Sequence, residues 1–164
     1  MEAKPVTHQF GPCYDQRSRV LILGSIPSPK SREQGFYYGH PRNRFWRVMA
    51  DVLGEPFPET VEARKAFLLR NRIALWDVLA SCRIRGADDS SIREPIPNDL
   101  GLILQEAPIE AVFTTGKKAK ELYDRMCRDR WGIEAFNLPS TSPANCACSY
   151  EKLLAEYGRV VEYL

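Results

Sequence analysis

The sequence has no long apolar run and almost no excess charge of either sign. No stretch approaches the ~18 apolar residues of a membrane-spanning helix, and residues 1–15 resemble neither a signal peptide nor a transit peptide. We therefore expect a cytoplasmic protein with no membrane partner. The formal net charge of +2 does not by itself indicate a nucleic-acid partner, because a basic face requires the charges to segregate.

Histidine is scarce, and the cysteines show no pairing pattern. Five cysteines, an odd number, are scattered along the chain, which argues against a disulfide framework. The one close pair is Cys146 and Cys148, and neither His8 nor His40 has a ligand-like spacing to it. We therefore expect no metal and no cofactor.

Signatures of phosphate-binding loops and serine hydrolases are also missing. The stretch TTGKK lacks the G-x-x-x-x-G-K-[ST] spacing of a phosphate-binding loop, so Gly116 indicates a tight turn between a strand and a helix. Lys117 would lie exposed in the first turn of that helix, where it could approach DNA phosphates. No G-x-S-x-G elbow occurs. Asp88, Asp89 and Asp99 are more typical of turns and helix caps than of a metal site.

What the chain does contain is an alternation of short apolar runs and helical patterns. Such alternation favours a parallel sheet covered by helices on both faces, with ligands bound at the carboxyl ends of the strands. We predict one α/β domain spanning residues 1–164. The predicted strands are Arg19–Gly24, Arg72–Leu79, Ile109–Gly116 and Ile133–Ser140. The predicted helices are Asn43–Leu53, Glu59–Asn71, Asn98–Glu106, Lys117–Arg130 and Ser149–Tyr157.

The segments after the first two strands, residues 24–43 and 76–99, read as long loops, and loops of that length within a compact domain usually carry function. The first contains three consecutive aromatic residues, Phe36 to Tyr38, and ends near Asn43. An aromatic platform beside an amide suits recognition of a planar base. Aromatic residues that only cover the edge of the core explain the pattern equally well.

The motifs in these segments resemble a known family. GSIPSPKSREQGFYYGHPRNRFW (residues 24–46) resembles the first motif region of the uracil-DNA glycosylase superfamily, in which a Gly-x-x-Pro loop leads to a His-Pro-x-Asn-x-Phe-Trp helix start. LPSTSPAN (residues 138–145) is similar to its second motif. With ALWDVLASC and DSSI, the set is most similar to the deoxyinosine (hypoxanthine) DNA glycosylase family, over roughly Leu21 to Leu154.

This resemblance implies a three-layer α/β/α sandwich around a mainly parallel four-stranded sheet. It implies a monofunctional, monomeric, nucleoid-associated enzyme that flips a deaminated base out of double-stranded or single-stranded DNA. The enzyme would then hydrolyse the N-glycosidic bond, with hypoxanthine in deoxyinosine as the expected substrate.

The resemblance also implies roles for individual residues. Asn43 would be catalytic, Tyr38 would stack on the flipped base with Phe36 nearby, and Ser25 would contact the base. Asp77 stands roughly where relatives carry a base-reading Asn. A carboxylate there would accept a hydrogen bond from N1–H of hypoxanthine and repel the N1 acceptor of adenine, although a helix or turn cap remains an open alternative for Asp77.

The second motif would contact the duplex through hydroxyl groups and a small wedge. Its residues would bind phosphates or fill the gap left by the flipped base, with Lys117 approaching a phosphate nearby. They are Ser140, Thr141, Ser142, Pro143, Ala144 and Asn145.

Two positions depart from the wider superfamily pattern. Ile26 stands where the mismatch-specific branch has an Asn that orients the attacking water, and Leu138 stands where many relatives have a His. Both departures also characterise the hypoxanthine family. The alternatives that stay open are a uracil or mismatch-specific glycosylase, which Ile26 opposes, and a non-catalytic nucleic-acid-binding domain on the same fold.

Overall fold

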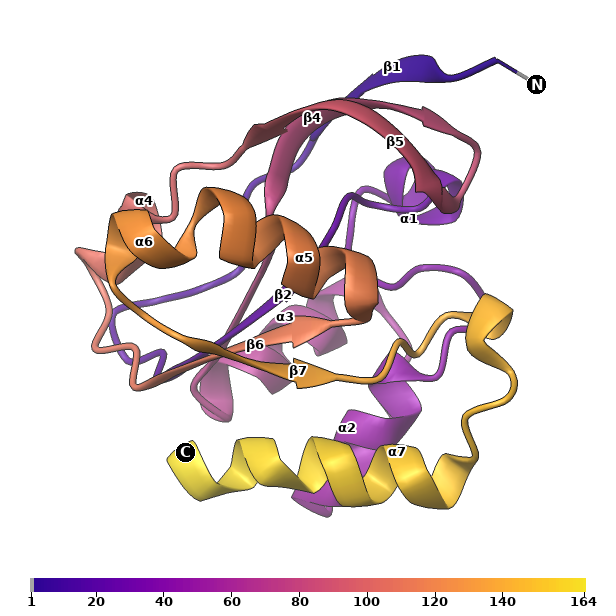
Figure 1. The fold of residues 1–164 in the computed structure, drawn as a ribbon. Coiled ribbons are helices and arrows are strands. Elements are labelled where there is room, and N and C mark those ends of the chain that lie inside the picture. Colours follow the sequence, from indigo (N-terminus) through magenta and orange to yellow (C-terminus); the bar gives the residue numbers. More distant parts are fainter. Residues whose placement is uncertain (1) are drawn as a thin grey trace.

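Four parallel strands form the central sheet of the protein (Figure 1). In the computed structural model, which describes residues 2–164, they pair in the order β3–β2–β6–β7. Every residue of β2 and β3 is buried, as expected of apolar strands covered on both faces. The predicted sheet is confirmed, with the bounds Val20–Gly24 (β2), Ile73–Asp77 (β3), Ala111–Thr115 (β6) and Ala135–Leu138 (β7).

Helices cover both faces of this sheet and complete the three predicted layers. In Figure 1, α5 and α6 lie above the sheet and α2 and α7 lie below it. The longer helices are α2 (Phe45–Leu53), α3 (Val61–Arg70), α5 (Lys117–Met126) and α7 (Tyr150–Tyr157). The short ones are α1 (Pro29–Gln34), α4 (Gly101–Leu104), α6 (Arg128–Trp131) and the 3-10 turns η1 (Pro143–Asn145) and η2 (Gly158–Tyr163).

Two predicted helices differ from the observed ones. Residues Lys117–Arg130 form two helices, because the backbone at Cys127 leaves the helical conformation with φ −124°. Residues Asn98–Glu106 form only the single turn of α4, and the Asn98 side chain instead donates hydrogen bonds to the backbone oxygens of Asp77 and Leu79. That side chain therefore fixes the chain at the end of β3.

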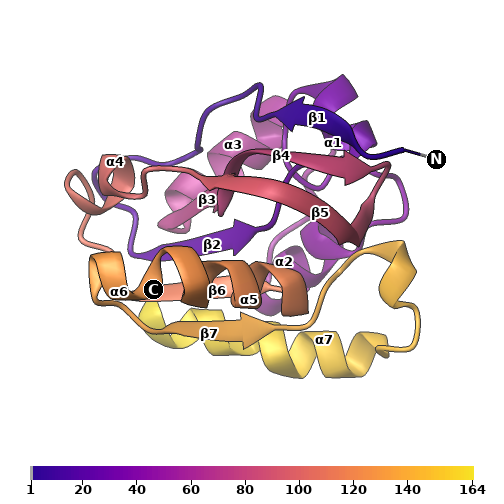
Figure 2. The ribbon, with the colours of Figure 1, turned by 45° about the horizontal axis from the view of Figure 1, so that its top comes forward.

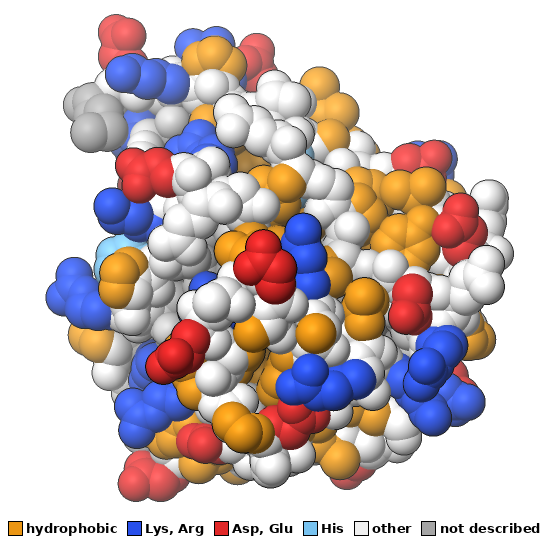
Figure 3. Space-filling model, turned by 180° about the vertical axis from the view of Figure 1, so that it is seen from behind, with side chains coloured by type: hydrophobic (Ala, Val, Ile, Leu, Met, Phe, Trp, Pro, Cys, Tyr) orange, Lys and Arg blue, Asp and Glu red, His pale blue; other side chains and the backbone are white. Residues whose placement is uncertain are grey.

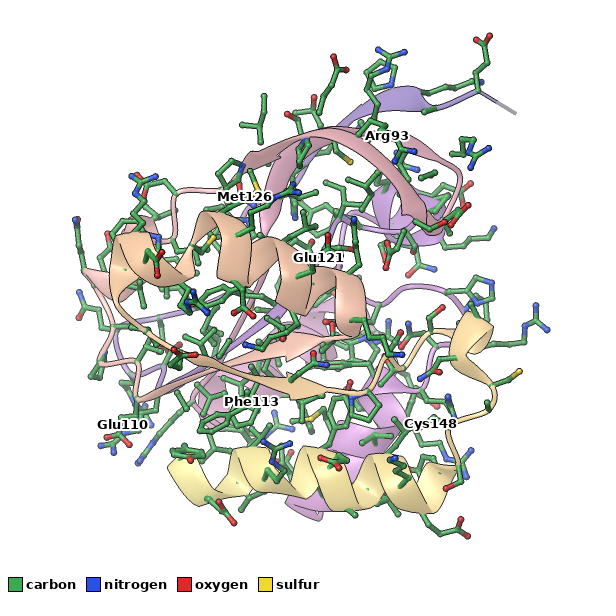
Figure 4. The ribbon with its side chains drawn as sticks, in the orientation of Figure 1. Arg93, Glu110, Phe113, Glu121, Met126 and Cys148 are labelled. Atoms are coloured by element: carbon green, nitrogen blue, oxygen red, sulfur yellow. The ribbon has the colours of Figure 1, made fainter. Side chains whose placement is uncertain are left out.

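Aromatic side chains fill the core between the sheet and the lower helices. Phe45 and Trp46 at the start of α2 are 0% and 1% exposed, so their prediction as core residues is confirmed. Phe113 on β6 points from the sheet toward the C-terminal helices (Figure 4) and lies 5.9 Å, between ring centroids, from Tyr163. The core thus supports the sheet directly beneath its central strands.

The main difference from the sequence prediction is a second, antiparallel sheet of three strands in the order β1–β4–β5. Its strands are β1 (Lys4–Thr7), β4 (Leu79–Arg85) and β5 (Asp88–Pro97). Residues 76–99, predicted as a loop, therefore mostly form a hairpin, and the N-terminal tail supplies an edge strand. Figure 2 shows this sheet on the α5 side of the central sheet, with β5 beside α5.

On the face seen from behind in Figure 3, basic and acidic side chains are interspersed, in keeping with the small net charge. Within residues 2–164, no helix has the length and apolar composition required to cross a membrane.

Candidate active site

A cavity of about 270 Å³ opens where β2, β3 and β6 end. Gly24, Asp77 and Thr115, the last residues of these strands, line it together with both long sequence motifs. This is the expected location for a ligand site, because the carboxyl ends of parallel strands meet at one edge of the sheet. Its volume is close to about 300 Å³, the lower end of the range for small-molecule pockets.

A buried carboxylate–imidazole pair adjoins the cavity: Asp77 lines it, and His8 contacts Asp77 without lining the cavity itself. The Asp77 and His8 side chains are 6% and 4% exposed, and Oδ2 of Asp77 lies 2.8 Å from Nε2 of His8. The His8 ring packs edge-on against Phe10, with 4.8 Å between centroids. Among the described residues Nδ1 of His8 has no hydrogen-bond partner, so the neutral tautomer that donates from Nε2 leaves the least unsatisfied polarity.

The other oxygen of Asp77 is held close to Gly24. A Cβ atom at Gly24 would lie 2.6 Å from Oδ1 of Asp77, nearer than nonbonded atoms approach, so any larger residue would displace the carboxylate. Because His8 occupies Oδ2 and Asn98 fixes the backbone oxygen, the carboxylate has one defined orientation. Asp77 therefore presents a fixed hydrogen-bond acceptor rather than a turn or helix cap.

Tyr38 lines the cavity in a constrained conformation. Its φ is +53°, which is uncommon for a residue other than glycine. Its ring stacks on Phe45 with 3.9 Å between centroids, and its hydroxyl lies 3.3 Å from Oγ1 of Thr115. Burial, and then the nearby Asp77 charge, raise the pKa of Tyr38 well above its usual range, which keeps the phenol neutral.

The other two aromatic residues of this segment are packed inward. Phe36 does not line the cavity: it is 3% exposed and its ring stacks on Trp46, so the structure corrects its expected place beside a flipped base. Tyr37 is equally buried, lines the cavity, and donates from its hydroxyl to the Gly11 backbone oxygen at 3.0 Å. Three consecutive aromatic residues thus pack within one cluster, because the positive φ of Tyr38 turns the chain.

Asn43 lines the cavity from the segment that leads into α2. Its Oδ1 accepts from the backbone N–H of Phe45 at 2.9 Å and from the Thr141 hydroxyl at 2.8 Å. Both partners are donors, so the orientation of the amide is determined by its contacts. The carbonyl is therefore occupied, and the NH₂ group is the part of the side chain left to act on a ligand.

The second-motif loop forms the opposite wall. Ser140, Thr141, Ser142, Pro143 and Ala144 line the cavity, whereas Asn145 and Lys117 do not. Thr141 is 1% exposed and bonded to Asn43, so it is turned inward rather than toward a phosphate. Lys117 is exposed in the first turn of α5.

The hairpin adds a second carboxylate to the cavity. Asp89 on β5 lines it, and Oδ1 of Asp89 accepts from the Ser25 hydroxyl at 3.0 Å. Burial is the main cause that raises the pKa of Asp89 above its ordinary value, and the negative charge of Asp77 acts in the same direction. Its neighbour Asp88 accepts instead from the backbone and hydroxyl of Ser90, as expected of a turn residue.

His8, Asp89 and Thr115 are residues of the site that the sequence did not indicate. His8 lies 69 residues from Asp77 in sequence, and no local pattern links the two. Asp89 had only a partial signal, since the last four residues of LASCRIR alternate between buried and exposed as in a strand, whereas the first three do not. Within residues 2–164, no three His, Cys, Asp or Glu side chains form a cluster that could hold a metal ion.

Comparison with known proteins adds independent information about the fold and the site. Residues 11–164 match the Uracil DNA glycosylase superfamily. Two proteins named "Hypoxanthine DNA glycosylase", from Methanosarcina barkeri and Methanosarcina acetivorans, are each 36% identical over 138 residues, which cover 83% of this chain and 86% of the relative. A solution NMR structure of a "putative Uracil DNA glycosylase" from M. acetivorans is 32% identical, with a TM-score of 0.78 over 99% of both chains.

Proposed function

Because the chain belongs to the uracil DNA glycosylase superfamily, we propose that it is a monofunctional DNA glycosylase that releases hypoxanthine from deoxyinosine. The observation that carries the substrate assignment is the buried Asp77 carboxylate, which His8 holds as an acceptor. Hypoxanthine offers a donor at N1, whereas adenine offers an acceptor there, so the carboxylate attracts the deaminated base and repels the normal one. The names of the two relatives support the same substrate.

The proposed catalytic residue is Asn43. Cleavage of the N-glycosidic bond leaves its electron pair on the base, and a positioned N–H donor stabilises the negative charge that develops there. The occupied carbonyl of Asn43 supports this role over one in which the carbonyl orients water. Thr141 would therefore act by positioning Asn43.

The flipped base would lie between Tyr38 and the second-motif loop. One face of the Tyr38 ring is covered by Phe45, and stacking of a base on the cavity side would stabilise the extruded conformation. We further propose that Ser140, Ser142, Pro143, Ala144, Asn145 and Lys117 contact the DNA on either side of the lesion. The enzyme would act as a monomer on double-stranded or single-stranded DNA, in the cytoplasm at the nucleoid.

Base release from defined oligonucleotides tests this function. We expect DNA with a single deoxyinosine to yield free hypoxanthine and an alkali-labile abasic site, in the presence of a chelator and with no added cofactor. DNA with uracil or xanthine in the same position should react more slowly. Uracil released faster than hypoxanthine would identify a uracil glycosylase, and binding without release of any base would identify a non-catalytic domain.

A further inference from the structure

Hydrolysis of an N-glycosidic bond requires more than a donor at the base. When the C1′–N9 bond breaks, its electron pair leaves with the base and positive charge develops on the sugar. A water molecule then bonds to C1′ and gives up a proton. A carboxylate at the level of the sugar can stabilise the cation and accept that proton.

Most titratable groups of the cavity are unsuited to this task. Burial raises the pKa of Tyr37 and of Tyr38 well above their usual range, so both phenols stay protonated. Asp77 is 4% exposed, one of its oxygens is bonded to His8, and the proposed function uses this carboxylate as the acceptor for N1–H of the base. His40 accepts from the backbone N–H of Arg42 through Nδ1, which leaves that nitrogen without a free lone pair.

Asp89 has the position and the free oxygen that the step requires. Among residues 2–164, the Ser25 hydroxyl is its one hydrogen-bond partner, and it bonds Oδ1 only. The residue Asp89 keeps an exposed surface at the cavity wall even though its carboxyl group is partly desolvated there, whereas Asp77 is only 4% exposed, so Asp89 lies nearer the mouth of the cavity. A flipped nucleotide enters with its base first while its sugar stays joined to the strand, so the sugar stops near the mouth.

We propose that Asp89 is a second catalytic residue, whose carboxylate orients the attacking water and stabilises the cationic sugar. The water oxygen bonds to C1′, its proton passes to the free oxygen of Asp89, and the electron pair of the broken bond leaves on hypoxanthine, which regains a proton from solvent. This inference rests on the proposed function. It also explains how a cavity with the apolar Ile26 on its wall could support hydrolysis.

The same geometry gives Ser25 a role through Asp89. Ser25 is 8% exposed and donates to Oδ1 of Asp89, so it orients the carboxylate with the other oxygen free. Ser25 is therefore a positioning residue in this proposal, in addition to the base contact expected from the sequence.

The test compares Asp89→Asn with Asp88→Asn, which removes the same charge from the adjacent residue of the hairpin. We expect Asp89→Asn to lower the single-turnover rate on deoxyinosine DNA about 100-fold or more, and Asp88→Asn to change it less than about twofold. Affinity for the DNA and melting temperature should stay close to wild type in both variants. A wild-type rate in Asp89→Asn, or an equal loss in both variants, would overturn the proposal.

The dependence of the rate on pH provides a second readout. The groups that face Asp89 are Ser25, Asp77, Lys118 and Asp88. The active form of Asp89 is the carboxylate, and its pKa is raised. The wild-type rate should therefore fall as the pH is lowered, and the midpoint of that fall should lie above the ordinary pKa of ~3.9 for Asp. The variant Asp89→Asn should lack this fall, whereas an unchanged fall in the variant would assign it to a group other than Asp89 and contradict the proposal.

The test of Asp89 can be distinguished from the test of the proposed function. If wild-type protein releases hypoxanthine, the function stands, and the variants decide only the role of Asp89. If wild-type protein releases no base from any of the three substrates, both proposals fail together.

Discussion

At the scale of single residues, the two polar atoms of the Asn43 side chain have different surroundings. Oδ1 accepts from Phe45 and Thr141, so the same side chain both organises the start of α2 and holds an N–H group at the cavity. A change that removes the whole side chain therefore mixes a structural effect with the loss of the proposed catalytic group. A change that keeps the oxygen separates them.

We expect Asn43→Ala to lower the single-turnover rate about tenfold to a thousandfold, because the donor to the departing base is lost. Asn43→Asp keeps an oxygen for Phe45 and Thr141 and should match Asn43→Ala in rate while remaining nearer wild type in melting temperature. Binding to deoxyinosine DNA should change much less than the rate in Asn43→Ala. A fully active Asn43→Asp would show that the N–H group is not required.

His8 is tested by a change that keeps its ring. His8→Phe preserves packing against Phe10 but leaves the buried Asp77 carboxylate without its donor, which should cost about 1–3 kcal/mol of unfolding free energy. It should also slow the reaction, because the Asp77 carboxylate loses the donor that holds it in place as the proposed acceptor for N1–H. His8→Gln retains a side-chain donor and should behave more like wild type. Equal stability and rate in His8→Phe and wild type, measured by urea unfolding and single turnover, would contradict this role.

Tyr38 tests the base pocket itself. Tyr38→Ala should weaken productive binding to deoxyinosine DNA by about 1–3 kcal/mol, the usual contribution of one base–aromatic stack. Tyr38→Phe keeps the ring and loses only the 3.3 Å contact to Thr115, so it should have little effect. The measurement is the affinity of each variant for deoxyinosine and undamaged duplexes, together with its melting temperature. A stable Tyr38→Ala variant that still distinguishes the two duplexes as well as wild type would exclude stacking by Tyr38.

At the scale of elements, Arg44 ties the second-motif loop to the start of α2. Its guanidinium donates to the backbone oxygens of Cys148 at 2.7 Å and Asn145 at 3.1 Å. The backbone N–H of Arg44 donates to the backbone oxygen of Thr141. The two motifs of the sequence are therefore one unit in space. Figure 4 shows Cys148 on the segment that leads from this loop into α7.

We expect Arg44→Lys to loosen this loop, because one ammonium group cannot reproduce the two-pronged contact of a guanidinium. Hydrogen exchange of the backbone amides in residues 139–148 should become faster, by an amount equivalent to about 1–3 kcal/mol, and the reaction rate should fall. Arg47→Lys is the matched control, since Arg47 lies over the Tyr150 ring at 4.7 Å and is exposed. Identical exchange in the two variants would exclude a role for Arg44 in holding the loop.

The β4–β5 hairpin is the element that changes the interpretation of the site most. Residues 76–99 contain two prolines and many polar residues, features that resemble a loop, and the register of β4 with β5 is irregular at several points. Such irregular strands show little of the period-two pattern that identifies a strand. As a result, Asp89 could be assigned to a turn from the sequence and to the cavity only from the structure.

At the scale of the whole molecule, the alternating apolar runs of the sequence were sufficient to determine the parallel sheet and the helices that cover it. A strand that is buried on both faces is a continuous run of apolar residues, so it is visible within a single segment of the sequence. The sequence likewise predicted the edge at which the candidate site lies, because the carboxyl ends of neighbouring parallel strands meet there. This rule accounts for Asp77 at the end of β3, and the segment that follows β2 brings Tyr38 and Asn43 to the same cavity.

The partners of these residues depended on the tertiary structure alone. His8 reaches Asp77 across 69 positions, and Thr141 reaches Asn43 across 98, so neither contact has a signature in local sequence. The same holds for Asp89 beside Ser25 and for Phe36 packed on Trp46 instead of facing the cavity. A side chain's residue type determines which hydrogen bonds it can form, but the packing of distant segments determines which of them it forms. At this site that packing places Phe36 in the core, pairs Asp77 with His8, bonds the Asn43 carbonyl to Thr141 and leaves one oxygen of Asp89 free.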